Sequence, residues 1–520
     1  MTDVVPLTGP TGVASAVDLF GEWHDRGADA TSTTYRSLLP ATAPVPGQQY
    51  RFEVDLDRCT GCKACVAACH SLNGLDEDET WRSVGLLVGG GTARSDAAST
   101  VEPVWHQHVT TACHHCVEPA CLAGCPVEAY EKDPITGIVA HLDDQCIGCR
   151  YCMLTCPYEI PTFNDRLGVV RKCDMCSDRL ADGEEPACVQ GCPTDAISIG
   201  LVDAAALRAD LIVDPDGRLV PTAPLSAHTG PTTVYLTKRP VPAGATAADD
   251  HRIVPAHNHP PLVAMLVLTQ LSVGAFVISR VVGWSGSGPA ADSLSAFVAW
   301  ATGLVAIGAS VLHLGRPLVA WRAVLGLRHS WLSREIVAFG LYAPLGGATA
   351  AADVGWLSRS WATPLAIATA VTGILGVYCS AKLYAVTGRP FWRLDRSAAR
   401  FVLGAAATGA PAIGLVADDG VGSAMSVVVV TAVVSLLAST LVFHLRHRGH
   451  ADALGRSSAL LTGTLRPQLG RAIGFAVLAA GTGGLGWWAV ALPAALAAVW
   501  IERSLFFVAA SPDRMPGGFR

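Results

Sequence analysis

The pattern of hydrophobic and polar positions changes near residue 258 of this 520-residue chain. From about residue 260 onward, the sequence forms apolar runs long enough to cross a bilayer, which requires roughly 20 residues each. Soluble buried helices are shorter and would not recur in this way. We therefore expect eight membrane-spanning helices, at about 260–283, 291–313, 335–356, 362–385, 398–417, 423–445, 470–487 and 489–510.

The apolar runs contain many small residues, which let membrane helices approach one another closely. This composition favours an all-α bundle of eight transmembrane helices over a single anchor. The turn between the last two spans is the least defined boundary. It falls around Trp487, Trp488 and Pro493.

Before the spans, the sequence predicts three segments. Residues 1–50 have little regularity and predict an N-terminal arm, and residues 51–200 predict a compact α+β domain. Residues 201–258 are rich in Pro, Thr and Ala and contain one short β-like run at 233–236, which is typical of a linker packed on that domain. The membrane part is expected over 259–511 and a C-terminal tail over 512–520.

Charge divides the sequence at the same place. Residues 1–250 carry 34 acidic and 17 basic side chains, whereas the remainder carries 9 acidic and 20 basic ones. An asymmetry of this size suggests an acidic soluble domain that docks on a basic surface of the membrane part. Nucleic acid is not an expected partner.

Sixteen of the 17 cysteines lie in four groups of four before residue 193. Two groups have the C-x2-C-x2-C-x3-C spacing of bacterial ferredoxins, in which three thiolates bind one [4Fe–4S] cluster and the fourth binds another. Three groups end in Cys-Pro. The groups are Cys59, Cys62, Cys65, Cys69; Cys113, Cys116, Cys121, Cys125; Cys146, Cys149, Cys152, Cys156; and Cys173, Cys176, Cys188, Cys192.

This pattern predicts a polyferredoxin domain of ferredoxin-like repeats with four [4Fe–4S] clusters. Zinc sites also use C-x2-C pairs, but repeated ferredoxin quartets ending in Pro are not zinc-ribbon spacing. A disulfide framework would require an oxidising compartment, and no secretory signal is recognised at the N-terminus. Cys379, alone in the fourth span, is expected to be a packing residue.

Residues 51–200 resemble the four-cluster electron-transfer subunit of the dimethyl sulfoxide reductase family of molybdenum enzymes, and residues 258–510 resemble the membrane anchor subunit of that family. The anchor resemblance rests on the segments 313–317 (HLGRP), 330–336 (SWLSREI) and 502–503 (ER). The polypeptide therefore looks like a fusion of the two subunits.

The resemblance implies four cluster-binding sets in which one cysteine crosses between groups. We name each set after its first clustered cysteine. They are the Cys59 set (Cys59, Cys62, Cys65, Cys192), the Cys173 set (Cys173, Cys176, Cys188, Cys69), the Cys113 set (Cys113, Cys116, Cys121, Cys156) and the Cys146 set (Cys146, Cys149, Cys152, Cys125). In the family the last set lies nearest the membrane. Relatives with Trp at the position of Cys149 hold a three-iron cluster, so Cys149 implies the four-iron form.

Quinol oxidation needs a proton acceptor near the quinol hydroxyls, and neutral His or carboxylate serves at working pH. His313 ends the second expected span and Glu335 begins the third, so one loop places both at the same membrane face. Ionisable residues at membrane depth are costly and are functional candidates. The resemblance implies that both accept protons from menaquinol or ubiquinol. Arg316 and Arg334 either orient a quinone carbonyl or contact the acidic domain.

Other polar residues have less specific explanations. Glu502 and Arg503 predict an internal ion pair in preference to a second quinone site. His257, Asn258 and His259 lie either on the rim of the quinol site or at an ordinary polar boundary of the membrane. No span has a histidine near its middle, so b-type haem is not expected.

The sequence contains no constellation for substrate reduction, so we expect a large molybdopterin-containing subunit as the catalytic partner. The leading hypothesis is an electron-transfer and anchor component that oxidises quinol and passes electrons through the clusters to that partner, which reduces an S-oxide, N-oxide, nitrate or similar acceptor. The alternative is the reverse flow, from a formate or sulfur-compound dehydrogenase to quinone. An ion-translocating module is a third hypothesis, but it would need a series of mid-membrane charges.

Positive charge predicts the orientation in the inner membrane. Counted from the span ends through the loops, the three connections after even-numbered spans have fourteen Lys and Arg residues, against two for the odd-numbered connections, and such residues favour the cytoplasm. The acidic domain would then face the cytoplasm, although the same charges could serve docking. The absence of a twin-arginine pair in the sequence supports the same expectation.

Overall fold

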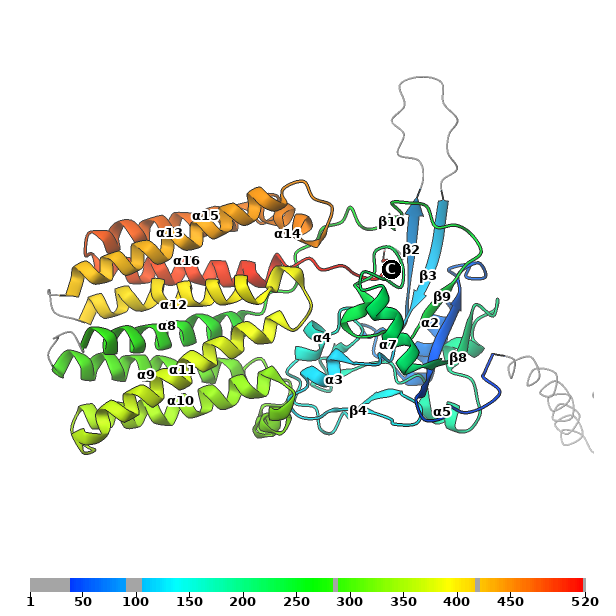
Figure 1. Ribbon diagram of the computed structural model, residues 1–520, viewed down its shortest axis with the longest axis horizontal. Helices are drawn as coiled ribbons and strands as arrows, with labels where there is room; N and C mark the ends of the chain where they lie inside the picture. The colour runs from blue at the N-terminus through cyan, green and yellow to red at the C-terminus, as the bar shows by residue number, and fades with distance from the viewer. Residues whose placement is uncertain (1–37, 90–104, 284–288, 417–420, 518–520) are drawn as a thin grey trace, which may run out of the picture.

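The computed structural model describes residues 38–89, 105–283, 289–416 and 421–517. Figure 1 shows long helices aligned side by side in one part and short strands and helices in the other. The polypeptide passes from the second part into the bundle, and its C-terminus returns to the strands.

The N-terminal part contains two small sheets. The first has the order β8–β1–β9, in which β1 (Gln48–Asp55) pairs antiparallel with β8 (Ile197–Asp203) and parallel with β9 (Val234–Leu236). The second has the order β10–β2–β3. Its strands are β2 (Ser83–Gly89), β3 (Trp105–Thr111) and β10 (Thr246–Ala247).

Two short hairpins and several short helices complete this part. The hairpins are β4 (Tyr130–Lys132) with β5 (Val139–His141), and β6 (Thr162–Asn164) with β7 (Val169–Arg171). The helices α2 to α6 each contain or directly follow clustered cysteines, and α7 follows β8. Their bounds are α2 Ala64–Asn73, α3 Ala120–Gly124, α4 Tyr151–Thr155, α5 Ser177–Ala181, α6 Ala187–Gln190 and α7 Ala204–Val213. This arrangement of strands and short helices confirms the expected α+β class.

The membrane part is a bundle of long antiparallel helices. The bounds are α8 Pro260–Gly283, α9 Pro289–Val311, α10 Trp331–Asp353, α11 Ala362–Ala385, α12 Leu394–Val416, α13 Gly422–His447, α15 Arg466–Gly484 and α16 Trp488–Val508. Within the described ranges, seven helices are long and apolar enough to cross a bilayer. The helix outside this group is α15, which begins Arg-Pro-Gln and ends in glycines.

The connections at one end of the bundle are structured. A 3-10 helix, η2 (Pro317–Arg328), joins α9 to α10; a shorter one, η4 (Pro390–Trp392), joins α11 to α12; and α14 (Ala453–Thr462) precedes α15. The break between the last two long helices lies at Trp487, while Pro493 is inside α16.

The linker and tail are integrated into the N-terminal part. Residues 201–258 supply α7, β9 and β10, so this segment holds more regular structure than the one expected short run. The tail after α16 returns to β2, where the Leu86 amide donates to the Gly517 carbonyl at 3.0 Å. Arg218 and Arg456 both bind Asp513, each at 2.8 Å. The tail therefore ties the two parts together.

Candidate functional site

The first and third cysteine groups share one backbone conformation. Gly61 and Gly148 have φ values of 74° and 69°, and the residues after the second cysteine, Lys63 and Arg150, have φ values of 64° and 60°. Positive φ is unusual outside glycine and tightens the loop around its thiols. The repeat in sequence is thus a repeat in structure.

The structure brings cysteines from distant groups together. The four thiols of the Cys59 set line one small cavity of about 20 Å³, although Cys192 lies far along the sequence from the other three. The Cys113 set lines a second cavity of about 20 Å³.

The other two sets are also gathered. Cys69 interacts electrostatically with Cys188 and Cys176, and Cys149 with Cys125 and Cys146. Each set therefore offers four thiolate donors from three clustered cysteines and one distant cysteine. That donor set fits a [4Fe–4S] cluster.

A large cavity of about 730 Å³ lies where the two parts meet. Its lining comes from the cysteine loop 147–154, the segment before α8, the end of α9, α10, and residues near α11 and α16. Cys149, His313 and Glu335 all contribute to this lining. A thiol of the Cys146 set and both predicted proton acceptors therefore face one space.

Glu335 is buried on α10, with 4% of its surface exposed, and accepts a hydrogen bond from the Ser380 hydroxyl of α11. In the described part of the sequence it forms no ion pair with a basic side chain. His313 lies in the turn after α9. Burial, then the positive charge of Arg150, then His257, lower the pKa of His313 to about 4. His313 is therefore neutral at physiological pH and able to accept a proton.

Two more histidines extend from His313 toward the surface. The His259 ring lies 5.3 Å from that of His313 and 4.8 Å from that of His257, measured between ring centroids. His259 and His257 also line the cavity, and His257 is exposed. Burial, followed by the neighbouring His313, lowers the pKa of His259 to about 4. The rim alternative for these residues thus fits the structure.

Arg316 and Arg334 do not line this cavity. Arg316 instead donates to the Asp143 carbonyl of the N-terminal part at 2.7 Å, and Arg322 donates to the Asp144 carbonyl at 2.9 Å. Arg334 donates to carbonyls of its own connection and lies 4.4 Å from the Trp331 ring centroid. Arg316 therefore has the docking role that the sequence left open, and the basic residues facing the cavity are Arg150 and Arg389.

Several anchor-motif residues, together with the neighbouring His329, contact the N-terminal part. The Gly315 and Arg316 amides donate to the carbonyls of Gly148 and Ile147, at 3.3 and 3.0 Å. Ser330 donates to the Gly124 carbonyl at 2.6 Å, and His329 bonds to the Cys125 carbonyl at 3.0 Å. These contacts hold α9 and α10 against the loops of the Cys146 set.

Several cavity residues were not predicted from sequence. Tyr151, whose hydroxyl donates to the Leu383 carbonyl at 2.6 Å, and the aromatic residues Tyr384, Trp392 and Phe507 line it. Arg150 was also missed. The signal for Tyr151 and Arg150 was their position beside Cys149, but only the fold shows that this loop faces the bundle.

Glu502 and Arg503 do form the predicted ion pair inside α16. Arg503 also donates to the Gln270 side chain at 2.8 Å, and Arg400 lies 3.5 Å from Glu502. This network joins α8, α12 and α16. It is a polar contact between helices of the bundle and does not line the cavity.

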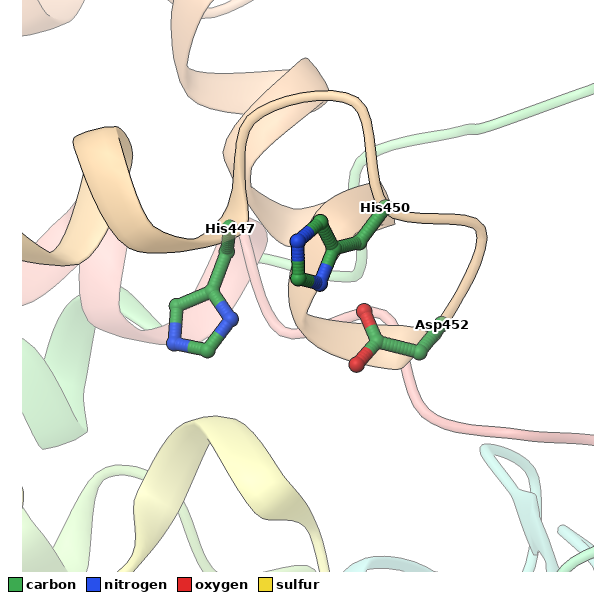
Figure 2. A group of neighbouring side chains, drawn as sticks. All are labelled: His447, His450 and Asp452. Atoms are coloured by element: carbon green, nitrogen blue, oxygen red, sulfur yellow. The ribbon is translucent and has the colours of Figure 1, made fainter.

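A separate group of side chains, His447, His450 and Asp452, lies where the end of α13 turns into α14 (Figure 2). One possible ligand atom from each lies within 4.8 Å of the others. However, His450 and Asp452 are exposed, and the Asp452 carboxylate already caps α14 by accepting from the Gly455 amide at 2.7 Å. Arg396 and Arg446 also lie near His447. We assign no ligand to this group.

Family models match both parts of the sequence. A 4Fe-4S binding domain matches residues 50–71, a 4Fe-4S dicluster domain matches residues 104–202, and the DMSO reductase anchor subunit (DmsC) matches residues 256–457. The anchor match therefore runs from just before α8 to a point within α14 and ends before α15. The protein has iron–sulfur binding domains and is an integral membrane protein.

Curated proteins resemble the N-terminal part. The B subunit of anaerobic dimethyl sulfoxide reductase from Escherichia coli strain K12 is 40% identical over 160 residues, which are 30% of this sequence and 75% of that subunit. The B subunit of the Haemophilus influenzae enzyme is 35% identical over 161 residues, 30% of this sequence and 76% of that subunit. Hydrogenase-2 operon protein HybA of Escherichia coli O157:H7 is 34% identical over 174 residues, 30% of this sequence and 53% of that protein.

Proposed function

This protein belongs to the anaerobic dimethyl sulfoxide reductase family, with an iron–sulfur region like the B subunit and an anchor-subunit region in one polypeptide, and from this premise we propose that it oxidises quinol in the membrane. It is the electron-transfer and anchor component of a molybdopterin oxidoreductase. The electrons pass to a separate catalytic subunit that reduces an S-oxide, N-oxide, nitrate or similar acceptor.

One observation supports this proposal above the others: the cavity of about 730 Å³ is lined at once by Cys149, His313 and Glu335. A quinol headgroup in this space would meet two proton acceptors and a thiol of the Cys146 set. Its aromatic and aliphatic lining suits an apolar ligand.

Within this cavity, His313 and Glu335 accept the two quinol protons. His313 is neutral before reaction, as an acceptor must be. His259 and His257 then form a route from His313 to the exposed surface beside the N-terminal part, which carries protons away from the buried end of the cavity. Arg150 and Arg389, which also line the cavity, contribute positive charge to the site.

Bound to the four cysteine sets, [4Fe–4S] clusters supply one-electron carriers between the cavity and the far side of the N-terminal part. Electrostatic interactions between neighbouring sets support an order for them. Tyr130 interacts with Cys152 of the Cys146 set and Cys121 of the Cys113 set. Cys173 interacts with Cys113, and Cys188 with Cys65. The Cys59 set, which includes the exposed Cys62, therefore lies at the end away from the membrane.

The partner is a large subunit with a molybdenum bis-pterin cofactor, which would receive electrons near the Cys59 set. The same architecture can run in reverse, from a formate or sulfur-compound dehydrogenase to quinone. The relationship to a hydrogenase-2 operon protein is the observation that keeps this second function in view. Cluster potentials measured against the quinone couple distinguish the two directions.

We further propose that α15 completes eight spans in the inner membrane, with the N-terminal part in the cytoplasm. Fourteen Lys and Arg residues occur in the connections on the side of the N-terminal part, against two on the other side. Some of these, such as Arg316 and Arg322, are used in docking. Thiol labelling of an engineered cysteine before Arg51 in intact spheroplasts tests the side: labelling from outside would invert this topology.

The central experiment compares quinol and dithionite as reductants of the clusters. Glu335→Gln and His313→Ala should each slow quinol-dependent reduction by about 10²-fold or more, because each removes a proton acceptor. Reduction by dithionite should be unchanged. His447→Ala, a histidine at another helix end outside the cavity, is the matched control. Normal quinol reduction in both cavity variants would place the site elsewhere.

A further inference from the structure

A buried cation without an acidic partner lies in the core of the N-terminal part. Arg82, just before β2, is 2% exposed. One guanidinium nitrogen donates to the Thr110 hydroxyl at 3.2 Å, and the guanidinium carbon lies 4.7 Å from the Phe52 ring centroid. Its other two nitrogens form no hydrogen bond to an oxygen or nitrogen atom, the Cys188 thiol interacts with the guanidinium, and no carboxylate pairs with it within the described ranges.

A charge this deeply buried is expensive unless opposite charge compensates it. The groups that act on Arg82 are thiols of two cysteine sets: Cys188, Cys173 and Cys69 of the Cys173 set, and Cys65 of the Cys59 set. The Thr110 hydroxyl that binds Arg82 also contacts the Cys65 sulfur at 3.6 Å. Arg82 therefore lies between two proposed cluster sites.

A second buried cation occupies the equivalent place between the Cys173 and Cys113 sets. Lys172 is 3% exposed, and its ammonium donates to the carbonyls of Val139 and Cys173, the latter at 2.8 Å. The thiols that act on it are Cys113 and Cys121 of one set and Cys173 of the other. Asp174 also interacts with Lys172, but no ion pair forms between them in the described part of the sequence.

We propose that Arg82 and Lys172 are redox-tuning residues, buried counter-charges that raise the reduction potentials of the clusters between which they lie. Reduction adds one electron to a site that already carries four thiolates. A fixed positive charge in low-dielectric surroundings stabilises the more negative reduced form. This inference rests on the proposed function only in requiring that the cysteine sets bind clusters.

The placement predicts an uneven effect along the series of clusters. The thiols that act most strongly on Arg82 belong to the Cys173 and Cys59 sets, and those that act most strongly on Lys172 belong to the Cys173 and Cys113 sets. No thiol of the Cys146 set is among the strongest interactions of either cation. Because both cations are buried, salt should screen their effects only weakly.

The test is potentiometric titration of the full-length protein, followed by electron paramagnetic resonance. Arg82→Gln should lower the midpoint potentials of the clusters in the Cys59 and Cys173 sets. Lys172→Gln should lower those of the clusters in the Cys173 and Cys113 sets, so the Cys173 cluster is shifted in both variants. The cluster nearest the quinol cavity should keep its potential in both. Arg82→Lys retains the charge and should restore most of the shift, which a purely structural role would not explain.

Arg208→Gln, an exposed arginine of the same part that pairs with Glu118, is the matched control and should move no potential. Iron content separates the possible failures. Full iron with unchanged potentials in both Gln variants would overturn the tuning role alone. A wild-type protein without clusters would instead overturn the proposed function.

Discussion

The two parts of this molecule distribute their chemistry in opposite ways. In the N-terminal part, cysteine sets and buried cations run through the core from one side to the other. In the membrane part, the helices are apolar over most of their length, and the cavity residues gather at the end that meets the N-terminal part. The groups for electron transfer therefore extend through the whole N-terminal part, whereas the reactive residues of the membrane part are confined to one end of the bundle.

This difference explains why the interface has functional importance. Neither part by itself forms the large cavity, because Cys149 comes from one part and His313 and Glu335 come from the other. The interface contacts are mostly backbone carbonyls of the Cys125 and Cys146 loops bound by the connections around η2. The geometry of this interface therefore controls how closely a quinol in the cavity can approach the Cys146 set.

The largest effect is expected from a substitution that separates the two parts where their backbones lie close together, at Gly315 and Gly168. A Cβ on Gly315 would lie 2.1 Å from the Gly168 carbonyl oxygen, so Gly315→Val cannot fit without displacing the N-terminal part. A displacement of about 1 Å can cost roughly 10²-fold in rate. We expect quinol-dependent cluster reduction to fall by that order while iron content stays full. Gly308→Val, at an open position on α9, is the control.

A second change affects only the Cys146 set, which lies beside the cavity. Cys149→Trp removes one thiolate of the Cys146 set. The protein should then contain a three-iron cluster, which gives an electron paramagnetic resonance signal in its oxidised state. Iron analysis should fall from about sixteen to about fifteen per polypeptide. A wild-type protein that already shows a full three-iron signal, or that contains stoichiometric zinc, would contradict the assignment.

A third change tests the electrostatic effect of Arg150 on His313 within the cavity. Burial and, after it, the positive charge of Arg150 lower the pKa of His313, and protonated His313 cannot accept a quinol proton. In the wild type, activity through His313 should be lost only as pH falls through about 4. Arg150→Gln removes the positive charge, so the pKa should rise and the acid limb should move to higher pH.

The pH profile of quinol-dependent reduction measures that shift. Arg389→Gln is the matched control, because Arg389 lines the same cavity and acts on His259 but is not among the groups that act on His313. An unchanged acid limb in Arg150→Gln, with full iron content, would contradict the role assigned to His313.

The smallest effect should come from the rim of the interface. Arg322 donates one hydrogen bond to the Asp144 carbonyl at 2.9 Å and is half-buried. Arg322→Gln should destabilise docking by about 0.5–1.5 kcal/mol, the usual net value of such a bond. Thermal unfolding of the purified protein should show a small decrease, with quinol reduction close to the wild-type rate.

The sequence by itself determined the features that depend on local spacing. The cysteine groups, the positions of the long apolar helices and the ion pair of Glu502 with Arg503 follow from residues close together along the polypeptide. Hydropathy could not decide whether α15 crosses the membrane, because its charged beginning and glycine-rich end make it less apolar than its neighbours.

Only the tertiary structure decided which distant residues meet. It brought Cys192 to the Cys59 loop, folded residues 201–258 into both sheets, and returned the tail to β2. It also turned Arg316 toward the N-terminal part and left Arg150 facing the cavity. Such contacts depend on long-range packing, for which a single sequence carries no periodic signal. For that reason the ligand types were predictable, whereas the shape of the site was not.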